Sequence, residues 1–206
     1  VALACETDFV AATADFQNFL EALADHVIAN SPETAAEMLE QSWAGGGTVQ
    51  EALTEIIGKL GENMSLTDAK FIAVDDGFVG AYIHHNQQVG VISAIKTPAS
   101  REETEAVLKQ LGMHTAAVPP TALSRDDIDA TLVERETAIY REEVKGKPED
   151  IQDKIIQGKL NKYFAGVALR EQPWVMDDSK SVEKAIADTL GQGSIITDYA
   201  RFAIGD

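Results

Sequence analysis

The residues best suited to chemistry in this sequence are the histidines His84, His85 and His114 and the acids Asp75 and Asp76. Imidazole and carboxylate groups together can ligate a metal ion or transfer protons. Adjacent side chains on an extended segment point to opposite faces, so His84 and His85 cannot both reach one ion without a bend. The sequence also lacks an HExxH pattern, a glycine-rich phosphate loop and a GxSxG turn. We therefore expect no metal, no cofactor and no enzymatic activity, and keep a histidine-dependent metal enzyme as the least favoured alternative.

A second candidate site is the segment Thr7-Asp8-Phe9-Val10, which joins a short apolar run to a helical pattern. Such a run predicts a buried strand, and the change of hydrophobic period after it predicts a strand-to-helix corner. Thr7 or Asp8 can cap the helix by accepting a hydrogen bond from a backbone N–H group of its first turn. Phe9 can pack inward or project as an anchor for a partner, and packing inward is the commoner fate of an aromatic side chain.

The composition limits the classes of partner. The 206 residues include 17 basic and 34 acidic side chains, which give a net charge of -17. This charge repels phosphate backbones and anionic lipids, so we expect no direct contact with nucleic acid or membrane. The single cysteine, Cys5, excludes an internal disulfide, and no apolar stretch is long enough to cross a bilayer. A soluble protein of a reducing compartment is expected, with self-association left open.

The elements that must position these residues are helical in the first third of the chain. Apolar residues at helical spacing predict a core-facing helix that ends near Asn30. Ser31 and Pro32 are expected to begin a second helix, which residues 45–47, all glycine, would close. A capping box formed by Thr48 and Glu51 predicts a third helix, with Gly61 as its C-terminal stop.

Strand patterns follow from Lys70 onward. The apolar runs at 71–74 and 79–83 flank Asp75-Asp76-Gly77 and predict a hairpin, and a third strand is expected at 89–95. A helix on residues 103–111 comes next. Helices packed on one face of an antiparallel sheet are typical of an α+β fold.

The second half of the chain predicts two long helices followed by mixed elements. A capping box formed by Ser124 and Asp127 opens one helix, which ends at Gly146, and Pro148 opens the next, so the pair is expected to form a protruding antiparallel hairpin. A strand at 167–169, a helix at 181–190 and a last strand at 195–204 complete the prediction.

Five segments of the sequence resemble the elongation factor Ts family, the guanine-nucleotide exchange factors of elongation factor Tu. The first is Cys5-Glu6-Thr7-Asp8-Phe9-Val10-Ala11, followed by Asp15-Phe16-Gln17. The others, in the family's order, are residues 58–63 (GKLGEN), 82–86 (YIHHN) with 89–91 (VGV), 113–117 (MHTAA) and 172–176 (QPWVM). Together they cover essentially the whole chain, so the resemblance is specific.

The resemblance implies a partner and a set of contacts. Residues Thr7, Asp8, Phe9 and Val10 would form the exchange wedge, with Phe9 entering the G domain of elongation factor Tu near its magnesium and phosphate site. Other expected partner contacts are Leu60, Gly61, His84, Met113, His114, Val175 and Met176. The partner would be bound in its GDP and nucleotide-free forms. The expected compartment is the bacterial cytoplasm, with a plastid or the mitochondrial matrix as the alternative.

The resemblance also implies a domain organisation. We predict an N-terminal core subdomain with a helical part and first strand at 1–68 and further strands at 69–96, and a related C-terminal subdomain at 97–123 and 166–206. Residues 124–165 would form an inserted coiled-coil hairpin. The family's N-terminal ubiquitin-associated-like domain has no counterpart in this sequence. A divergent or processed organellar member with weak exchange activity is therefore the alternative function.

Overall fold

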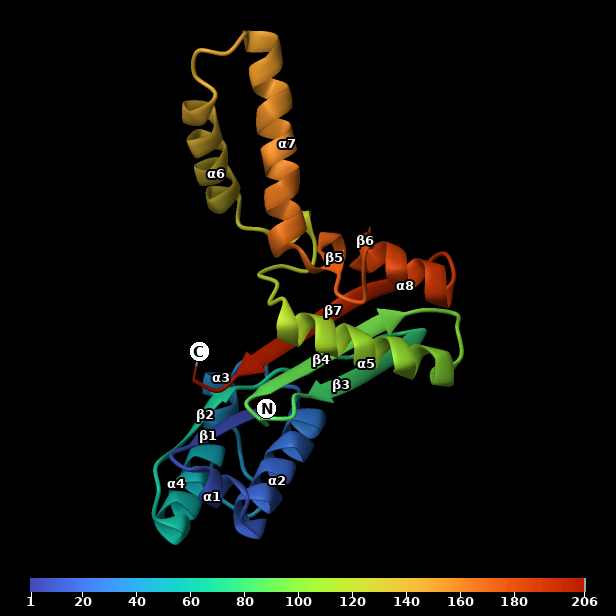
Figure 1. Cartoon of the computed structure of the whole chain (residues 1–206). Coiled ribbons are helices and arrows are strands. Elements are labelled where there is room, and N and C mark those ends of the chain that lie inside the picture. Colours follow the sequence, from blue (N-terminus) through green and yellow to red (C-terminus); the bar gives the residue numbers. More distant parts are fainter. Residues whose placement is uncertain (206) are drawn as a thin grey trace. The chain divides into compact units, whose positions relative to one another are not determined.

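A computed structural model of the chain describes residues 1–205, leaving aside the side chain at position 150. The helices are α1 (Asp8–Ala11), α2 (Ala14–Asn30), α3 (Ala35–Glu40), α4 (Val49–Leu60), α5 (Arg101–Ala117), α6 (Ala130–Glu143), α7 (Glu149–Val167) and α8 (Val182–Leu190), with short 3-10 turns η1 (Arg125–Asp127) and η2 (Leu169–Glu171). The strands are β1 (Ala2–Cys5), β2 (Met64–Asp68), β3 (Gly77–Ile83), β4 (Val89–Lys96), β5 (Pro173–Trp174), β6 (Asp177–Ser181) and β7 (Ile195–Ala203). Helices and small sheets are combined in an α+β fold, as the sequence predicted (Figure 1).

Two compact units divide the chain. Unit 1 comprises residues 1–73, 85–90 and the stretch from Phe202 on, and unit 2 comprises residues 74–84 and 91–201. The predicted subdomain limits, 1–68, 69–96, and 97–123 with 166–206, stay a proposal, as does the coiled-coil character of 124–165. Residue 206, the last of the predicted C-terminal part, lies outside the described residues.

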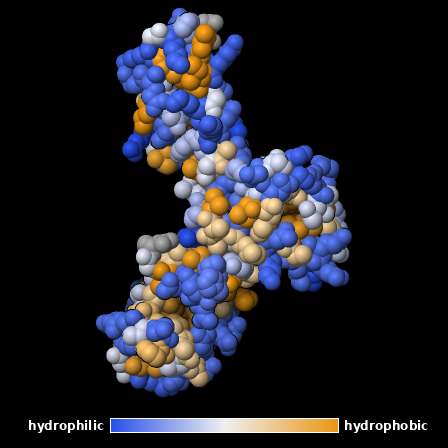
Figure 2. Space-filling model, in the orientation of Figure 1, coloured by the Kyte–Doolittle hydropathy of each residue, from blue (hydrophilic) through white to orange (hydrophobic). Residues whose placement is uncertain are grey.

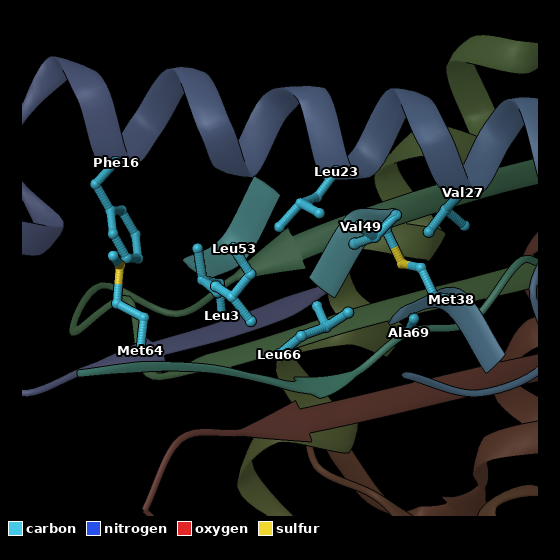
Figure 3. Packing of buried hydrophobic residues seen from close by; sticks show 10 residues of the cluster. All are labelled: Leu3, Phe16, Leu23, Val27, Met38, Val49, Leu53, Met64, Leu66 and Ala69. Carbon is cyan, nitrogen blue, oxygen red and sulfur yellow. The ribbon is translucent and has the colours of Figure 1, made fainter. Parts of the chain in front are cut away.

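Unit 1 is built on the antiparallel pair β1 and β2, in which Leu3 lies opposite Leu66 and Cys5 opposite Met64. Side chains alternate between the two faces of a strand, so Met64 and Leu66 are both buried on one face. Phe16, Leu23 and Val27 of α2 point into the same core, with Phe16 above Met64, because residues at this spacing share one face of a helix (Figure 3). The buried core consists of Leu3, Phe16, Leu23, Val27, Met38, Val49, Leu53, Met64, Leu66 and Ala69.

The helix ends of unit 1 confirm two predictions and correct two. Both hydrogen bonds of the Thr48–Glu51 capping box are present, and Gly61 ends α4 with a φ of 76°. Ser31 does not begin a helix, because it ends α2 in the left-handed conformation with a φ of 49°. Helix α3 begins only after Thr34, whose Oγ1 accepts a hydrogen bond from the Glu37 N–H at 3.1 Å. It ends at Glu40, so the glycines at 45–47 do not close it.

The strand prediction at 71–74 is wrong, because no strand forms there; β2 forms earlier instead and pairs with β1. The turn predicted at Asp75-Asp76-Gly77 leads directly into β3. A Cβ atom at Gly77 would come within 2.1 Å of the Ile95 carbonyl oxygen, so glycine permits the close approach of β4 rather than a turn between two strands. The hairpin that does form joins β3 to β4 through residues 84–88.

Most residues of the sheet β3-β4-β7 belong to unit 2, and the last strand predicted at 195–204 is confirmed as β7. Helix α5 is longer than the predicted 103–111 and packs closely on β3. A Cβ atom at Gly80 would lie 2.7 Å from Leu108 Cβ, and one at Gly112 would lie 2.3 Å from Tyr82 Cβ. The lack of side chains at Gly80 and Gly112 thus allows α5 to approach β3 closely. The buried core beside them consists of Ile95, Val107, Leu108, Leu111, Leu169, Trp174, Val182, Ile186, Leu190 and Ile196.

Helices α6 and α7 form the predicted antiparallel helical hairpin, with Gly146 in the turn at a φ of 88°. Lys159 joins the arms, since its Nζ contacts the Glu143 carboxylate and lies 5.2 Å from the centre of the Tyr140 ring. The visible face of the hairpin is mainly hydrophilic, with orange stretches between the polar residues (Figure 2). Charged surfaces of this kind are typical of solvated helix pairs.

The ends of the hairpin differ from the prediction in two places. The Ser124–Asp127 capping box is present but caps the 3-10 turn η1, and α6 begins after Asp129, whose Oδ1 accepts from the Thr131 N–H at 2.8 Å. The expected strand at 167–169 is wrong, because α7 continues through Val167 and η2 follows. A short apolar run does not distinguish a strand from the end of a buried helix.

Candidate functional site

The corner at Thr7 is organised as the sequence predicted, with Thr7 as the residue that caps α1. Its Oγ1 accepts a hydrogen bond from the Val10 N–H at 3.3 Å. The Cys5 thiol donates to the Thr7 carbonyl at 3.2 Å, and burial raises the pKa of this thiol above its usual value. A raised thiol pKa reduces the thiolate fraction, so Cys5 has the character of a structural cysteine.

Glu62, which follows α4 and is distant from Thr7 in the sequence, fixes this corner. Its two carboxylate oxygens accept hydrogen bonds from the Thr7 N–H at 3.1 Å and from the Thr7 hydroxyl at 2.7 Å. The next residue, Asn63, donates from its amide to the Glu6 carboxylate at 2.7 Å. Hydrogen bonds to an ionised group are stronger than neutral ones, so the segment after α4 holds the segment before α1.

The far end of α1 is fixed by the helix that follows it. The Thr13 hydroxyl donates to the Val10 carbonyl at 2.7 Å, and its Oγ1 also caps α2 by accepting from the Phe16 N–H at 3.3 Å. The Gln17 amide donates to the Ala11 carbonyl at 2.6 Å. A four-residue helix cannot be stable by itself, and these contacts supply the support that its length does not.

Phe9 projects from this supported turn into solvent, with 82% of its surface exposed. An exposed aromatic side chain of this size on a fixed backbone is typical of an anchor residue at a protein interface. The acid beside it, Asp8, is also exposed and lies in the first turn of α1. In the view of Figure 2, a tan to orange area lies over this end of unit 1 (Figures 1 and 2).

The structure places Leu60 and Gly61 beside the same corner. Leu60 is half-buried and packs against the core of unit 1. Gly61 directly precedes Glu62, and its left-handed φ of 76° directs the chain from α4 toward Thr7. Lys59 forms an ion pair with Asp15 at 2.8 Å, so α4 and α2 are also linked at this end. Six of the predicted residues, Thr7, Asp8, Phe9, Val10, Leu60 and Gly61, thus lie together.

The other five predicted residues, His84, Met113, His114, Val175 and Met176, belong to unit 2. His84 follows β3 and is half-buried, and its Nδ1 lies 2.9 Å from the Tyr82 hydroxyl. Met113, near the end of α5, is 40% exposed. Val175 and Met176 form the two-residue turn between β5 and β6 and are 47% and 46% exposed.

His114 has no exposed surface, and its ring contacts the segment that carries the turn. Its Nδ1 accepts a hydrogen bond from the Val175 N–H at 3.3 Å, and its Nε2 lies 3.0 Å from Gln172 Oε1. A backbone N–H group can only donate, so Nδ1 is unprotonated and Nε2 carries the hydrogen that Gln172 accepts. Burial lowers the pKa of His114, opposed by the hydrogen bond to Gln172, and the neutral form is favoured.

Two residues that support the site, Glu62 and Gln172, were not among the predicted site residues. Both stand in segments that resemble the family: Glu62 directly follows Gly61, and Gln172 precedes Val175 in the same segment. Their role depends on partners distant in sequence, Thr7 for Glu62 and His114 for Gln172. A sequence pattern contains no signal for such pairs. Locally, Glu62 is recognisable only as a polar residue beside a helix stop, and Gln172 only as a polar residue before a proline.

Two other kinds of site are absent from the described part of the chain. Within residues 1–205, no helix has the length and apolar character required to cross a membrane. In the same range, no three His, Cys, Asp or Glu side chains lie close enough together to hold a metal ion.

Comparisons with known proteins agree across the chain. A family model described as Elongation factor TS matches residues 6–206. Elongation factor Ts of Clostridium botulinum (strain Eklund 17B / Type B) is 38% identical over 211 residues, which cover 100% of this chain and 70% of the relative. Those of Trichlorobacter lovleyi and Cytophaga hutchinsonii are 39% and 37% identical, covering 98% and 99% of this chain and 68% and 73% of the relatives. The chain therefore belongs to the elongation factor Ts family of translation elongation factors.

Proposed function

We propose that this chain is a guanine-nucleotide exchange factor that binds elongation factor Tu in its GDP-bound and nucleotide-free forms and promotes release of GDP. The observation that supports this most directly is the 82% exposure of Phe9 on a short helix fixed at both ends. Exposing an aromatic side chain to water has a cost, which burial in a partner recovers.

In the proposed mechanism, Phe9 acts as a wedge. It enters the G domain near the magnesium and phosphate site and displaces the elements that hold the ion. Magnesium neutralises phosphate charge, so its loss weakens the binding of GDP. Because Thr7 and Val10 are already hydrogen-bonded in the free chain, little ordering entropy opposes insertion. Asp8 stabilises the N-terminal end of α1, where a negative charge interacts favourably with the helix dipole.

Exchange of this kind requires no covalent step. A protein that binds the nucleotide-free partner more tightly than the GDP form must lower the partner's affinity for GDP by the same coupling free energy. The free energy therefore comes from the interface itself. The net charge of -17 supports a protein partner over direct contact with nucleic acid, because it opposes phosphate.

The residues in unit 2 are proposed as a second contact region. Val175 and Met176 offer two exposed apolar side chains on one turn, and Met113 and His84 offer further exposed surface. Exposed apolar and aromatic side chains with polar neighbours are typical of protein interfaces. The relatives named above come from bacteria, which supports a bacterial partner, with an organellar setting and weak exchange as the alternative.

The test is stopped-flow release of a fluorescent GDP analogue from elongation factor Tu. The parent chain should accelerate release, and Phe9→Ala should reduce the acceleration by at least about tenfold, as expected for an interface anchor. Ile28→Ala is the matched control, because Ile28 is also an exposed apolar residue of unit 1, on α2. Binding without acceleration by the parent chain would favour the alternative, and absence of both would refute the proposal.

A further inference from the structure

We propose that His114 and Gln172 are positioning residues that hold the Val175–Met176 turn in the conformation in which it meets the partner protein. This inference rests on the proposed function. His114 cannot itself contact a partner, because its side chain has no exposed surface. Its Nδ1 instead accepts the backbone N–H of Val175 at 3.3 Å, so it acts on the turn directly.

The turn needs support of this kind because its backbone is not of the type that favours a tight hairpin. Two-residue hairpin loops are most stable when one or both loop residues have positive φ. Among residues 1–205, the non-glycine positions with positive φ are Ser31, Asp76 and Gln87, so Val175 and Met176 both have negative φ. The strand pair is short, and its register shifts between Pro173 and Trp174. Local preference alone does not fix this loop.

His114 supports the turn through two contacts of different kinds. One is the hydrogen bond that His114 accepts from the Val175 N–H group, which lies in the loop and does not bond to β6. The other is a stacked contact with Trp174, at 5.2 Å between ring centres and 27° between ring planes. Trp174 is itself buried in the core of unit 2. Trp174 is thus anchored in the core, whereas Val175 and Met176, which follow it, point outward.

Gln172 in turn fixes the imidazole. Its Oε1 accepts from His114 Nε2 at 3.0 Å, and its Nε2 donates to the Gly166 carbonyl at the end of α7 at 2.9 Å. Its carbonyl accepts the Val182 N–H at 2.9 Å, which places the start of α8. The chain of contacts therefore runs from α7 through Gln172 and His114 to Val175. A buried network whose members are all paired specifies one geometry.

The central experiment is a double-mutant cycle on binding to nucleotide-free elongation factor Tu. His114→Phe keeps an aromatic ring against Trp174 and removes both hydrogen bonds, so affinity should fall about threefold to tenfold. In the background of Val175→Ala with Met176→Ala, the same change should have less than about a twofold effect, since the presented side chains are already gone. Equal effects in both backgrounds would assign His114 a general structural role and overturn the proposal.

A second cycle, with Phe9→Ala, separates this inference from the proposed function. Phe9 lies in unit 1, so His114→Phe and Phe9→Ala should act additively on binding. If the parent chain does not bind the partner at all, the proposed function fails. If the parent binds and Phe9→Ala weakens binding, while His114→Phe leaves affinity unchanged, only the positioning role fails.

Two measurements on the unmodified chain, extended by one variant, test the geometry without the partner. Nitrogen chemical shifts of the imidazole should identify His114 as the neutral Nε2–H tautomer, and the amide of Val175 should exchange slowly with solvent. Gln172→Met, which removes the fixing amide at similar volume, should speed exchange at Val175. An Nδ1–H tautomer or a rapidly exchanging Val175 amide in the parent chain would overturn the proposal.

Discussion

The corner around Phe9 and the turn at Val175–Met176 both present exposed apolar side chains from short backbone segments, but their supports differ. At the corner, an ionised carboxylate near the surface, Glu62, accepts from Thr7. At the turn, a neutral imidazole with no exposed surface, His114, accepts from Val175. Removing a surface partner lets water replace it, whereas removing a buried partner leaves polar groups unpaired. The two regions therefore differ in how strongly their geometry depends on one side chain.

The two regions are expected to differ most in their effect on the rate of GDP release. Phe9→Ala should reduce the acceleration of GDP release about 100-fold, or about 2.7 kcal/mol, because a central aromatic anchor is lost. Met176→Ala, which truncates a half-exposed residue of the turn, should reduce it about threefold to tenfold. Stopped-flow traces with both variants would measure the ratio. A larger effect from Met176→Ala would reverse the assignment of wedge and second contact.

The next effect is on the stability of unit 2. Gln172→Leu leaves His114 Nε2 and the Gly166 carbonyl without their partner, so the free energy of unfolding should fall by about 2 kcal/mol. Urea unfolding measures this change. Gln192→Leu, at an exposed loop position, is the matched control and should change stability by less than about 0.5 kcal/mol. Equal values for the two variants would mean that the network does not stabilise the fold.

Acid should weaken the turn support through His114. Burial lowers the pKa of His114 in the folded chain, so as pH falls below the unfolded value near 6.5 the unfolded state binds the proton first. The stability that neutral His114 contributes to the folded chain is complete above that pH. It is lost as the pH falls toward the lower pKa of the folded state, by up to about 1.4 kcal/mol between pH 7.5 and 5.5. Urea unfolding at both pH values should show a smaller loss in His114→Phe. An identical loss would assign the acid sensitivity to other groups.

The smallest effect is expected at the corner support. Glu62→Ala removes both hydrogen bonds to Thr7, but water can reach these groups, so the unfolding free energy should fall by only about 1 kcal/mol. Exchange should slow about fivefold, because α1 loses one of its fixed ends. Glu55→Ala, an exposed acid on α4, is the control for the loss of charge. A loss of stability as large as that of Gln172→Leu would remove the distinction between surface and buried support.

The sequence by itself determined the features that depend on neighbouring residues. The caps at Thr7 and Thr48, the stop at Gly61, the Gly146 turn of the hairpin and the last strand are all confirmed, because each is encoded within a few residues. The family was also recognisable, since five short segments stand in a fixed order. The assignment of the exposed residues to a partner stays a proposal in both regions.

Only the tertiary structure decided the features that depend on distant partners. The run at 71–74 is apolar but forms no strand, and β2 forms because β1 lies opposite it. Phe9 could have packed inward; it is exposed because β1, α2 and α4 fill the core of unit 1 without it. In the sequence, His114 and Gln172 are only polar residues of two separate motifs. The fold buries them against each other. Pairing across many residues is set by packing, and local sequence does not specify it.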